Sequence, residues 1–173
     1  MERNYKIEGD TIKTAQKKKK VLFISSTGGH LSELLRLSPM FEKYDYFIIT
    51  EKTKSNLSLK EIYPKRIGYL VYGTKRKFLT YPFKLIYNSF KSLYYFIKIR
   101  PKVVVTTGTH TAGPMCYIAK IFRRKVVYIE TLANSKTKTA TGRLIYPIAD
   151  LFIVQWEEML KLYPKAKFGG WIY

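Results

Sequence analysis

The amino-acid sequence predicts an α/β fold built on one Rossmann-like parallel sheet. Two features lead to this prediction. Short runs of consecutive apolar residues recur along the chain, and such runs are typical of strands that are buried on both faces of a parallel sheet. Segments with apolar residues at helical spacing lie between the runs, and this alternation predicts right-handed βαβ units. The 173 residues are enough for a single domain with a sizeable core.

Six apolar runs are the predicted strands. The first begins abruptly at Val21, after a polar N-terminal segment, and the run at 67–72 is weaker than the other five. In chain order the runs are 21–25, 46–50, 67–72, 103–106, 126–129 and 151–154.

Three helices are predicted between these strands, from apolar residues that recur every three or four positions. The first follows the run at 21–25 and contains Pro39 near its end, and the others follow the runs at 103–106 and 126–129. The residues that define the three helices are Leu31, Leu34, Leu35 and Met40; Tyr117, Ile118, Ile121 and Phe122; and Leu144, Ile145 and Ile148.

The chain has 32 Lys and Arg residues against 12 Asp and Glu residues, a formal net charge of +20. This excess predicts an anionic partner, and the candidates are a phosphorylated ligand, an anionic membrane surface and a nucleic acid. We expect no nucleic acid, because no DNA- or RNA-binding motif is present and the basic residues do not form a recognition helix. A basic nucleotide- or RNA-binding Rossmann domain stays open as a remote alternative.

Residues 1–20 lack apolar periodicity and end in four consecutive lysines. We expect a flexible basic arm there and the folded domain over 21–173. The first ten residues have no apolar core, so no signal peptide is expected. No uncharged apolar stretch reaches the length of about eighteen residues that a spanning helix needs, so none is expected.

Other chemistry is excluded by residue types that are rare or missing. Cys116 is the only cysteine, which excludes a disulfide framework and a cysteine zinc site and is typical of a reducing compartment. Carboxylate pairs at helical spacing, clusters with metal-ligand spacing and a G-x-S-x-G motif are all missing. We therefore expect neither a hydrolase nor a metalloenzyme, and no metal or cofactor.

The segment 78–99 predicts a long amphipathic helix of unusual composition. Lys84, Lys91 and Lys98 recur every seven residues on one face, which Asn88 completes. The opposite face is bulky and apolar. Its residues are Phe83, Ile86, Tyr87, Phe90, Leu93, Tyr94 and Ile97.

Two interpretations of this helix are open. A helix that connects two strands normally packs its apolar face against the sheet. A basic helix rich in Phe and Tyr is instead typical of a bilayer interface, and the lack of Asp and Glu between residues 65 and 129 favours this second interpretation. The expected membrane contacts are Phe83, Lys84, Phe90, Lys91, Ile97 and Lys98.

Two glycine-containing loops are candidate ligand sites, because parallel sheets bind ligands at the carboxyl ends of their strands. In the first loop Thr27, Gly28 and Gly29 precede His30. Glycine lets the backbone approach a ligand, and N–H groups at a helix start suit phosphate oxygens. The dinucleotide spacing G-x-G-x-x-G is missing, and so is a Walker lysine. His30 could act as a general base near neutral pH or stabilise a phosphate.

The loop after the run at 103–106 repeats this layout with Gly108, Thr109 and His110, followed by a glycine and a proline that suit a helix start. Each of the two histidines of the chain therefore lies in a glycine loop, although a structural role for either stays open. Glu130 is the one acid that we expect at the carboxyl end of a strand, where a glutamate commonly binds a sugar hydroxyl or caps the next helix.

Several motifs together resemble one known family. They are Ser-Thr-Gly-Gly-His-Leu at 26–31, Gly108 with Pro114, Tyr-Ile-Glu at 128–130, 141–147, 150–159 and 163–165. Over about residues 20–173 the chain resembles the bacterial PssD/CpsF-type polysaccharide biosynthesis proteins, which are related to the membrane-anchoring subunit of the dolichol-pathway UDP-GlcNAc transferase. In that family the chain is similar to the N-terminal half of a GT-B glycosyltransferase such as MurG.

The resemblance implies a peripheral subunit of a two-component glycosyltransferase at the cytoplasmic face of the cell membrane, in capsular or exopolysaccharide synthesis. A second subunit supplies the C-terminal GT-B half and binds the UDP-sugar, and this chain binds a polyprenyl-diphosphate-linked sugar. We therefore expect His30 to be the catalytic base. From the layout of the loops at the strand ends we expect the acceptor contacts to be Thr27, Gly28, Gly29, Gly108, Thr109, His110 and Glu130, and the resemblance itself assigns no role to His110.

A lone GT-B half must also present a surface to the half that it lacks. Aromatic residues are enriched in the buried centres of interfaces, so we expect Trp156, Trp171 and the tail at 168–173 to contact the partner subunit. Burial of Trp156 in the core is the alternative. A non-catalytic anchor or activator would carry the same motifs, so the sequence leaves open whether this chain is catalytic, which sugar moves and which lipid accepts it.

Overall fold

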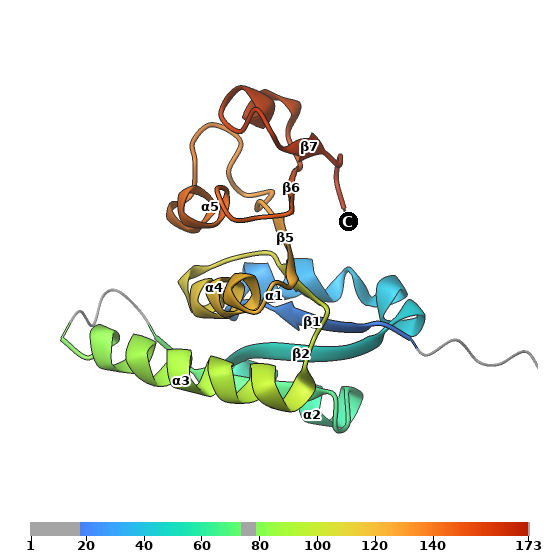
Figure 1. The fold of residues 1–173 in the computed structure, drawn as a ribbon, viewed down its shortest axis with the longest axis vertical. Coiled ribbons are helices and arrows are strands. Elements are labelled where there is room, and N and C mark those ends of the chain that lie inside the picture. The colour runs from blue at the N-terminus through green and yellow to red at the C-terminus, as the bar shows by residue number, and fades with distance from the viewer. Residues whose placement is uncertain (1–17, 74–78, 173) are drawn as a thin grey trace, which may run out of the picture.

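The computed structural model describes residues 18–73 and 79–172, which form a seven-stranded parallel sheet with helices on both faces (Figure 1). The strand order is β3-β2-β1-β4-β5-β6-β7, and every neighbouring pair is parallel. This confirms the predicted Rossmann-like α/β fold. The strands are β1 (Lys20–Ile24), β2 (Asp45–Lys52), β3 (Ile67–Val71), β4 (Val103–Thr106), β5 (Lys125–Ile129), β6 (Leu151–Val154) and β7 (Lys167–Phe168).

Five α-helices and four short 3-10 helices connect these strands in the described part of the chain. The α-helices are α1 (Gly29–Leu35), α2 (Leu59–Ile62), α3 (Tyr81–Ile99), α4 (Gly113–Ile121) and α5 (Ala140–Ile145). The 3-10 helices are Ser38–Lys43, Lys54–Asn56, His110–Ala112 and Glu157–Lys161. None of the described helices combines the length and the hydrophobicity that a membrane crossing requires.

Two separate cores explain why the strands are apolar throughout. Successive side chains of a strand point to opposite faces of the sheet. Leu22 and Ile24 of β1 therefore join the core beneath α3, α4 and α5, whereas Phe23 joins the core beneath α1. Lys20, which the sequence assigned to the N-terminal arm, belongs to β1, and residues 1–17 lie outside the described residues.

The first predicted helix is shorter than expected. α1 ends at Leu35, and Met40 lies on the separate 3-10 helix that begins at Ser38. Pro39 explains the break, because proline donates no backbone hydrogen bond and disfavours the helical conformation in the residue before it.

The second predicted helix is present as α4, but the apolar residues that defined it lie largely on its outer side. Ile121 and Phe122 are exposed, whereas Met115 and Cys116 are completely buried. The side of α4 that faces the sheet is therefore not the side that the apolar spacing indicated.

α3 lies along the free edge of β3 and turns polar side chains toward it. The Asn88 side chain donates to Val71 O over 2.8 Å and accepts from Val71 N over 2.9 Å, and the Tyr95 hydroxyl accepts from Tyr69 N over 3.2 Å. An edge strand has backbone N–H and C=O groups without a neighbouring strand, and α3 supplies their partners. This explains why the inner side of α3 carries an amide and a phenol.

The apolar face of α3 is consequently on the outside of the molecule. Phe83 and Phe90 are 75% and 70% exposed. The alternative that this apolar face packs against the sheet is therefore wrong. The helix begins at Tyr81, and Phe78, where the prediction placed its start, lies outside the described residues.

Candidate functional site

The loops after β1 and β4 meet at the carboxyl edge of the sheet. Ser26 N donates to Gly108 O over 3.3 Å, and a Cβ atom on Gly108 would lie 3.5 Å from the imidazole of His30. Gly108 has a φ of 96°, which favours glycine. The structure thus joins the two glycine loops that the sequence suggested separately.

His30 is held by two hydrogen bonds to Thr107. His30 Nδ1 lies 2.8 Å from Thr107 O, and the Thr107 hydroxyl donates to His30 O over 2.7 Å. Because a carbonyl oxygen only accepts hydrogen bonds, this contact assigns the proton of neutral His30 to Nδ1. Nε2 is then the nitrogen that can accept a proton, and the side chain is 27% exposed.

The turn that precedes His30 leaves space beside its backbone. Gly28 has a φ of 74°, a conformation that favours glycine. Among the described residues outside this turn, no heavy atom lies within 4 Å of where a Cβ of Gly28 or Gly29 would be. A ligand could therefore approach the backbone closely. Thr27 flanks this turn, with its hydroxyl 3.4 Å from that of Thr53.

Glu33 is buried one helical turn after His30. No role was predicted for it from the sequence. Its Oε1 accepts hydrogen bonds from Thr131 Oγ1 over 2.7 Å and Leu132 N over 3.2 Å. Its Oε2 is buried without a hydrogen bond in the described part of the chain and lies 3.8 Å from His30 Nδ1. Glu33 therefore lies beside the imidazole nitrogen that donates to Thr107 O.

Glu130 is also buried, only 1% exposed, and its hydrogen bonds go to the protein. It accepts from Thr131 N, Thr139 Oγ1 and Tyr163 OH at 3.0–3.1 Å. Burial raises the pKa of the Glu130 carboxyl above its usual range, against the lowering effect of these hydrogen bonds. Thr139 in turn caps α5 by accepting from Gly142 N, so Glu130 supports the helix cap indirectly.

Glu51 is a second acid at the carboxyl end of a strand, so the expectation that Glu130 stands alone there is wrong. It is buried near the end of β2, where Oε1 accepts from Thr111 Oγ1 over 2.6 Å and Gly73 N over 3.2 Å. Its Oε2 accepts from Thr27 N over 3.5 Å. Glu51 thus connects three loops. A signal was present, because this acid directly follows the apolar run at 46–50.

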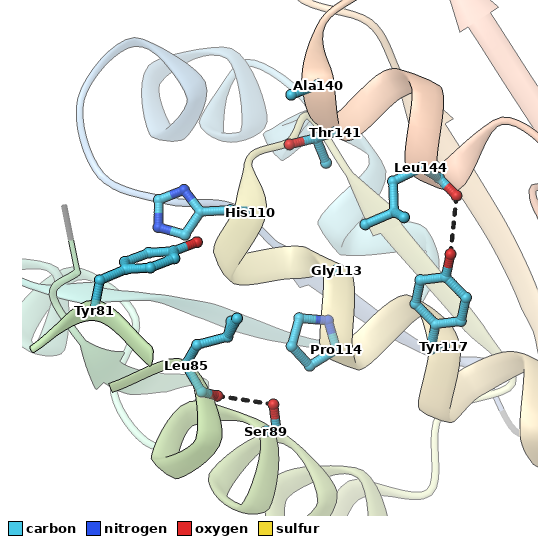
Figure 2. A pocket seen from close by; sticks show the side chains of 10 residues that line it. All are labelled: Tyr81, Leu85, Ser89, His110, Gly113, Pro114, Tyr117, Ala140, Thr141 and Leu144. Atoms are coloured by element: carbon cyan, nitrogen blue, oxygen red, sulfur yellow. Dashed lines mark hydrogen bonds between the residues drawn. The ribbon is translucent and has the colours of Figure 1, made fainter. Parts of the chain in front are cut away.

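His110 lines a cavity of about 370 Å³ (Figure 2). Its ring packs edge-on against Tyr81 with centroids 5.2 Å apart, and its Nε2 lies 4.0 Å from Glu51 Oε1. The cavity lies between the N-terminal halves of α3 and α4 and the helix α5. Its lining residues are Tyr81, Leu85, Ser89, His110, Gly113, Pro114, Tyr117, Ala140, Thr141 and Leu144.

The outer face of α3 combines exposed rings with lysines. Lys91 Nζ lies 5.6 Å from the centre of the Tyr87 ring, and Lys98 Nζ lies 5.8 Å from that of Tyr94. Lys84 Nζ donates to the backbone at Tyr72 O, just after the end of β3, over 3.0 Å. The basic side chains therefore border the apolar face on which Ile97 is also exposed.

The two tryptophans lie together near the carboxyl edge of the sheet. Trp156 is half-buried, and its indole N–H donates to Leu132 O over 2.8 Å. The Trp171 ring is 67% exposed and packs edge-on against Trp156 with centroids 5.7 Å apart.

In the described residues, no cluster of three or more His, Cys, Asp or Glu side chains could hold a metal ion.

Comparison with known proteins gives one family. The sequence model described as "Oligosaccharide biosynthesis protein Alg14 like" matches residues 21–172. The UDP-N-acetylglucosamine transferase subunit ALG14 of Candida albicans is 27% identical over 91% of this chain and 83% of its own length. The protein of the same name from Mus musculus is 25% identical over 91% of this chain and 84% of its own length.

Solved structures support the fold. Acinetobacter baumannii MurG superposes with a TM-score of 0.67 at 18% identity, over 81% of this chain and 42% of MurG. The UDP-GlcNAc 2-epimerase of Methanocaldococcus jannaschii superposes with a TM-score of 0.65 at 18% identity, over 84% of this chain and 42% of the epimerase. This chain therefore covers less than half of the length of each of these two proteins.

Proposed function

Because the chain belongs to the Alg14-like family of oligosaccharide biosynthesis proteins, we propose that it is the acceptor-binding, membrane-associated subunit of a two-component glycosyltransferase. In this proposal a second subunit with the C-terminal GT-B half binds the UDP-sugar. Two observations support this division of labour. The relatives are named as subunits of a UDP-GlcNAc transferase, and this chain covers only 42% of MurG.

The observation that carries the proposal is the arrangement of His30. Its tautomer is set by Thr107 O, so that Nε2 can accept a proton beside the open Gly28–Gly29 turn. A base fixed in this way next to a space for a ligand suits the deprotonation of an acceptor hydroxyl.

The proposed reaction is a displacement at the anomeric carbon of the UDP-sugar. His30 Nε2 takes the proton of the acceptor hydroxyl as the hydroxyl oxygen forms a bond to that carbon. The bond from the carbon to the UDP oxygen breaks, and its electron pair leaves with UDP. Glu33, 3.8 Å from Nδ1, stabilises the imidazolium that forms.

The acceptor in this proposal is a sugar linked to a polyprenyl diphosphate. Its diphosphate binds the backbone of the Gly28–Gly29 turn and the Gly108 loop, with Thr27 and Thr109 as hydroxyl donors. In this proposal Glu130 supports the loops of the site from within the protein, because its carboxylate already accepts hydrogen bonds from protein groups. A role in capsular or exopolysaccharide synthesis is part of the proposal, and so is UDP-GlcNAc as the donor.

Membrane association is proposed through the outer face of α3 at the cytoplasmic side of the cell membrane. The exposed Phe83, Phe90 and Ile97 would enter the bilayer interface, and Lys84, Lys91 and Lys98 would meet anionic headgroups. The partner subunit is proposed to contact Trp171 and Trp156, which lie beside the loop that follows β5.

The test is reconstitution. The tagged chain is purified from its own cells together with its donor-binding subunit, and the pair is given radiolabelled UDP-GlcNAc and a polyprenyl-diphosphate-linked sugar. We expect label in the lipid fraction with both subunits and none with either alone. Transfer by this chain alone would overturn the division of labour, and a pair inactive with every UDP-sugar tested would overturn the glycosyltransferase assignment.

A further inference from the structure

We propose that the cavity between α3, α4 and α5 binds the first isoprene units of the lipid-diphosphate acceptor. This inference rests on the proposed function and adds a subsite to it. The cavity has a volume of about 370 Å³, which lies within the range of about 300–1,000 Å³ that is usual for small-molecule pockets.

The chemistry of the walls favours an apolar occupant. The polar groups of Ser89 and Tyr117 are turned to the protein, because Ser89 Oγ donates to Leu85 O over 2.8 Å and Tyr117 OH donates to Leu144 O over 3.1 Å (Figure 2). The remaining surface is largely hydrocarbon, from Leu85, Pro114 and Leu144. An apolar chain would lose no hydrogen bonds by entering, and its burial is favourable.

One end of the cavity is polar and adjoins the proposed diphosphate site. His110 lines the cavity and follows Gly108 by two residues, and a Cβ atom on Gly108 would lie only 3.5 Å from the imidazole of His30. A ligand with an anionic head and an apolar tail would therefore place its head at the glycine loops and its tail between the helices.

The other end is apolar and partly open. Leu144 is 51% exposed at the rim. On α3, which supplies Leu85 and Ser89 to the cavity, the neighbouring residue Ile86 is also exposed. The rest of a long polyprenyl chain could leave the cavity along this apolar surface toward the bilayer. The occupant that fits both ends is an isoprenoid diphosphate.

The experiment measures binding by the purified chain of geranylgeranyl diphosphate, inorganic diphosphate and geranylgeraniol, without vesicles. We expect geranylgeranyl diphosphate to bind at least tenfold more tightly than diphosphate, a ratio that requires burial of only about 60 Å² of apolar surface. Ser89→Phe, which fills the cavity, should reduce its affinity to that of diphosphate. Ser89→Ala is the matched control and should bind like the wild type.

Two more variants keep the test decisive. Leu144→Trp fills the cavity from α5, so the result does not depend on one substitution. Phe90→Asp tests the outer face of α3 as the alternative place for the apolar chain, because Phe90 is exposed and does not line the cavity. Thermal unfolding of each variant checks that it is folded.

The outcomes separate the cavity from the proposed function. Equal affinities for geranylgeranyl diphosphate and diphosphate would overturn the cavity proposal and leave the acceptor function standing. Loss of binding in Phe90→Asp but not in the cavity variants would place the chain on the outer face, and would also overturn the cavity proposal. If the wild type bound neither diphosphate, the acceptor-binding function itself would fail.

Discussion

His30 and Thr107 are joined by two hydrogen bonds that run in opposite directions. The imidazole donates to the threonine carbonyl, and the threonine hydroxyl donates to the histidine carbonyl. The pair links the loop after β4 to the start of α1. The side chain, the backbone and the tautomer of His30 are therefore fixed together, which is what a base needs to meet an acceptor hydroxyl in one orientation.

His30→Ala should lower the turnover of the reconstituted pair by at least about 100-fold, the lower end of the range for general-base catalysis. The rate of sugar transfer at saturating acceptor measures this effect. Co-purification with the donor-binding subunit and binding to vesicles should stay unchanged. Full turnover in the variant would mean that the base comes from the partner, and this chain would then present the acceptor without being catalytic.

Phe83→Asp together with Phe90→Asp should release the protein from vesicles that contain phosphatidylglycerol. The two rings are exposed, so the variant should remain folded, as circular dichroism can check. Ile62→Asp is the matched control, because this exposed apolar residue lies on α2. High salt should also weaken binding, since each basic residue near an anionic surface contributes about 1 kcal/mol. Unaltered sedimentation of the double variant would refute the membrane face.

Gly142→Ala should destabilise the protein by about 1–3 kcal/mol, the usual cost of overpacking. An added Cβ would lie 2.3 Å from Glu130 Oε2 and 2.4 Å from Tyr163 OH. Gly29→Ala is the control, and urea unfolding should find it within about 0.5 kcal/mol of the wild type, because beyond the adjoining backbone its Cβ would meet no described atom within 4 Å. Gly29→Val should instead weaken diphosphate binding. Equal stability of the Gly142 variant would contradict the packing around Glu130.

Asp150→Asn should destabilise the fold at neutral pH and much less in acid. Burial alone would raise the pKa of Asp150, but hydrogen bonds from Val126 N, Lys125 and Lys120 lower it to about 2. Because the folded pKa is depressed, the stabilisation is present above the unfolded value of about 3.9 and is lost as the pH falls through about 2. The shift would correspond to about 2.5 kcal/mol in a fully buried group, and solvent screening at this partly exposed carboxyl reduces the expected effect to about 1–2 kcal/mol. Urea unfolding of the wild type and the variant should show a smaller difference in the free energy of unfolding at pH 3 than at pH 7. An equal difference at the two pH values would refute the prediction.

Trp171→Ala should weaken association with the donor-binding subunit without changing the free energy of unfolding by more than about 0.5 kcal/mol, because the ring is exposed in the isolated chain. At an interface the loss for a tryptophan is commonly about 2 kcal/mol or more. Titration of the labelled partner measures it. An unchanged dissociation constant would remove Trp171 from the interface.

Six of the seven strands in the described part of the chain could be predicted from the sequence, because they are largely buried on both faces, whereas both residues of β7 are exposed and form no apolar run. An apolar run such as that around Phe23 admits few other structures in a chain of this composition. The inner sides of the helices could not be predicted in the same way. α4 buries Met115 beside the small residues Gly113, Cys116 and Ala119 and leaves larger apolar residues outside, and α3 faces a strand edge through Asn88, so the bulkiest apolar side chains do not mark the buried side of either helix.

Only those parts of the candidate site that lie within one short stretch of sequence could be predicted. The glycine loops and both histidines stand out as motifs, and the structure joins the loops. Glu33 and Glu51 gain their roles through contacts with residues distant in the chain, such as Thr131 and Thr111, and no pattern in one sequence reports those contacts. Glu33 did carry a weak signal, since it follows His30 by three positions on a helix, the spacing at which side chains meet.

The attachment of α3 to β3 has a consequence for where the reaction can take place. Hydrogen bonds are directional, so the two that join Asn88 to Val71 prevent α3 from rolling about its axis as a helix held only by apolar contacts could. If the outer face of α3 rests on the bilayer, the fold then fixes the distance between His30 and the membrane plane. Such a fixed distance selects acceptors by the length of the segment between lipid and sugar.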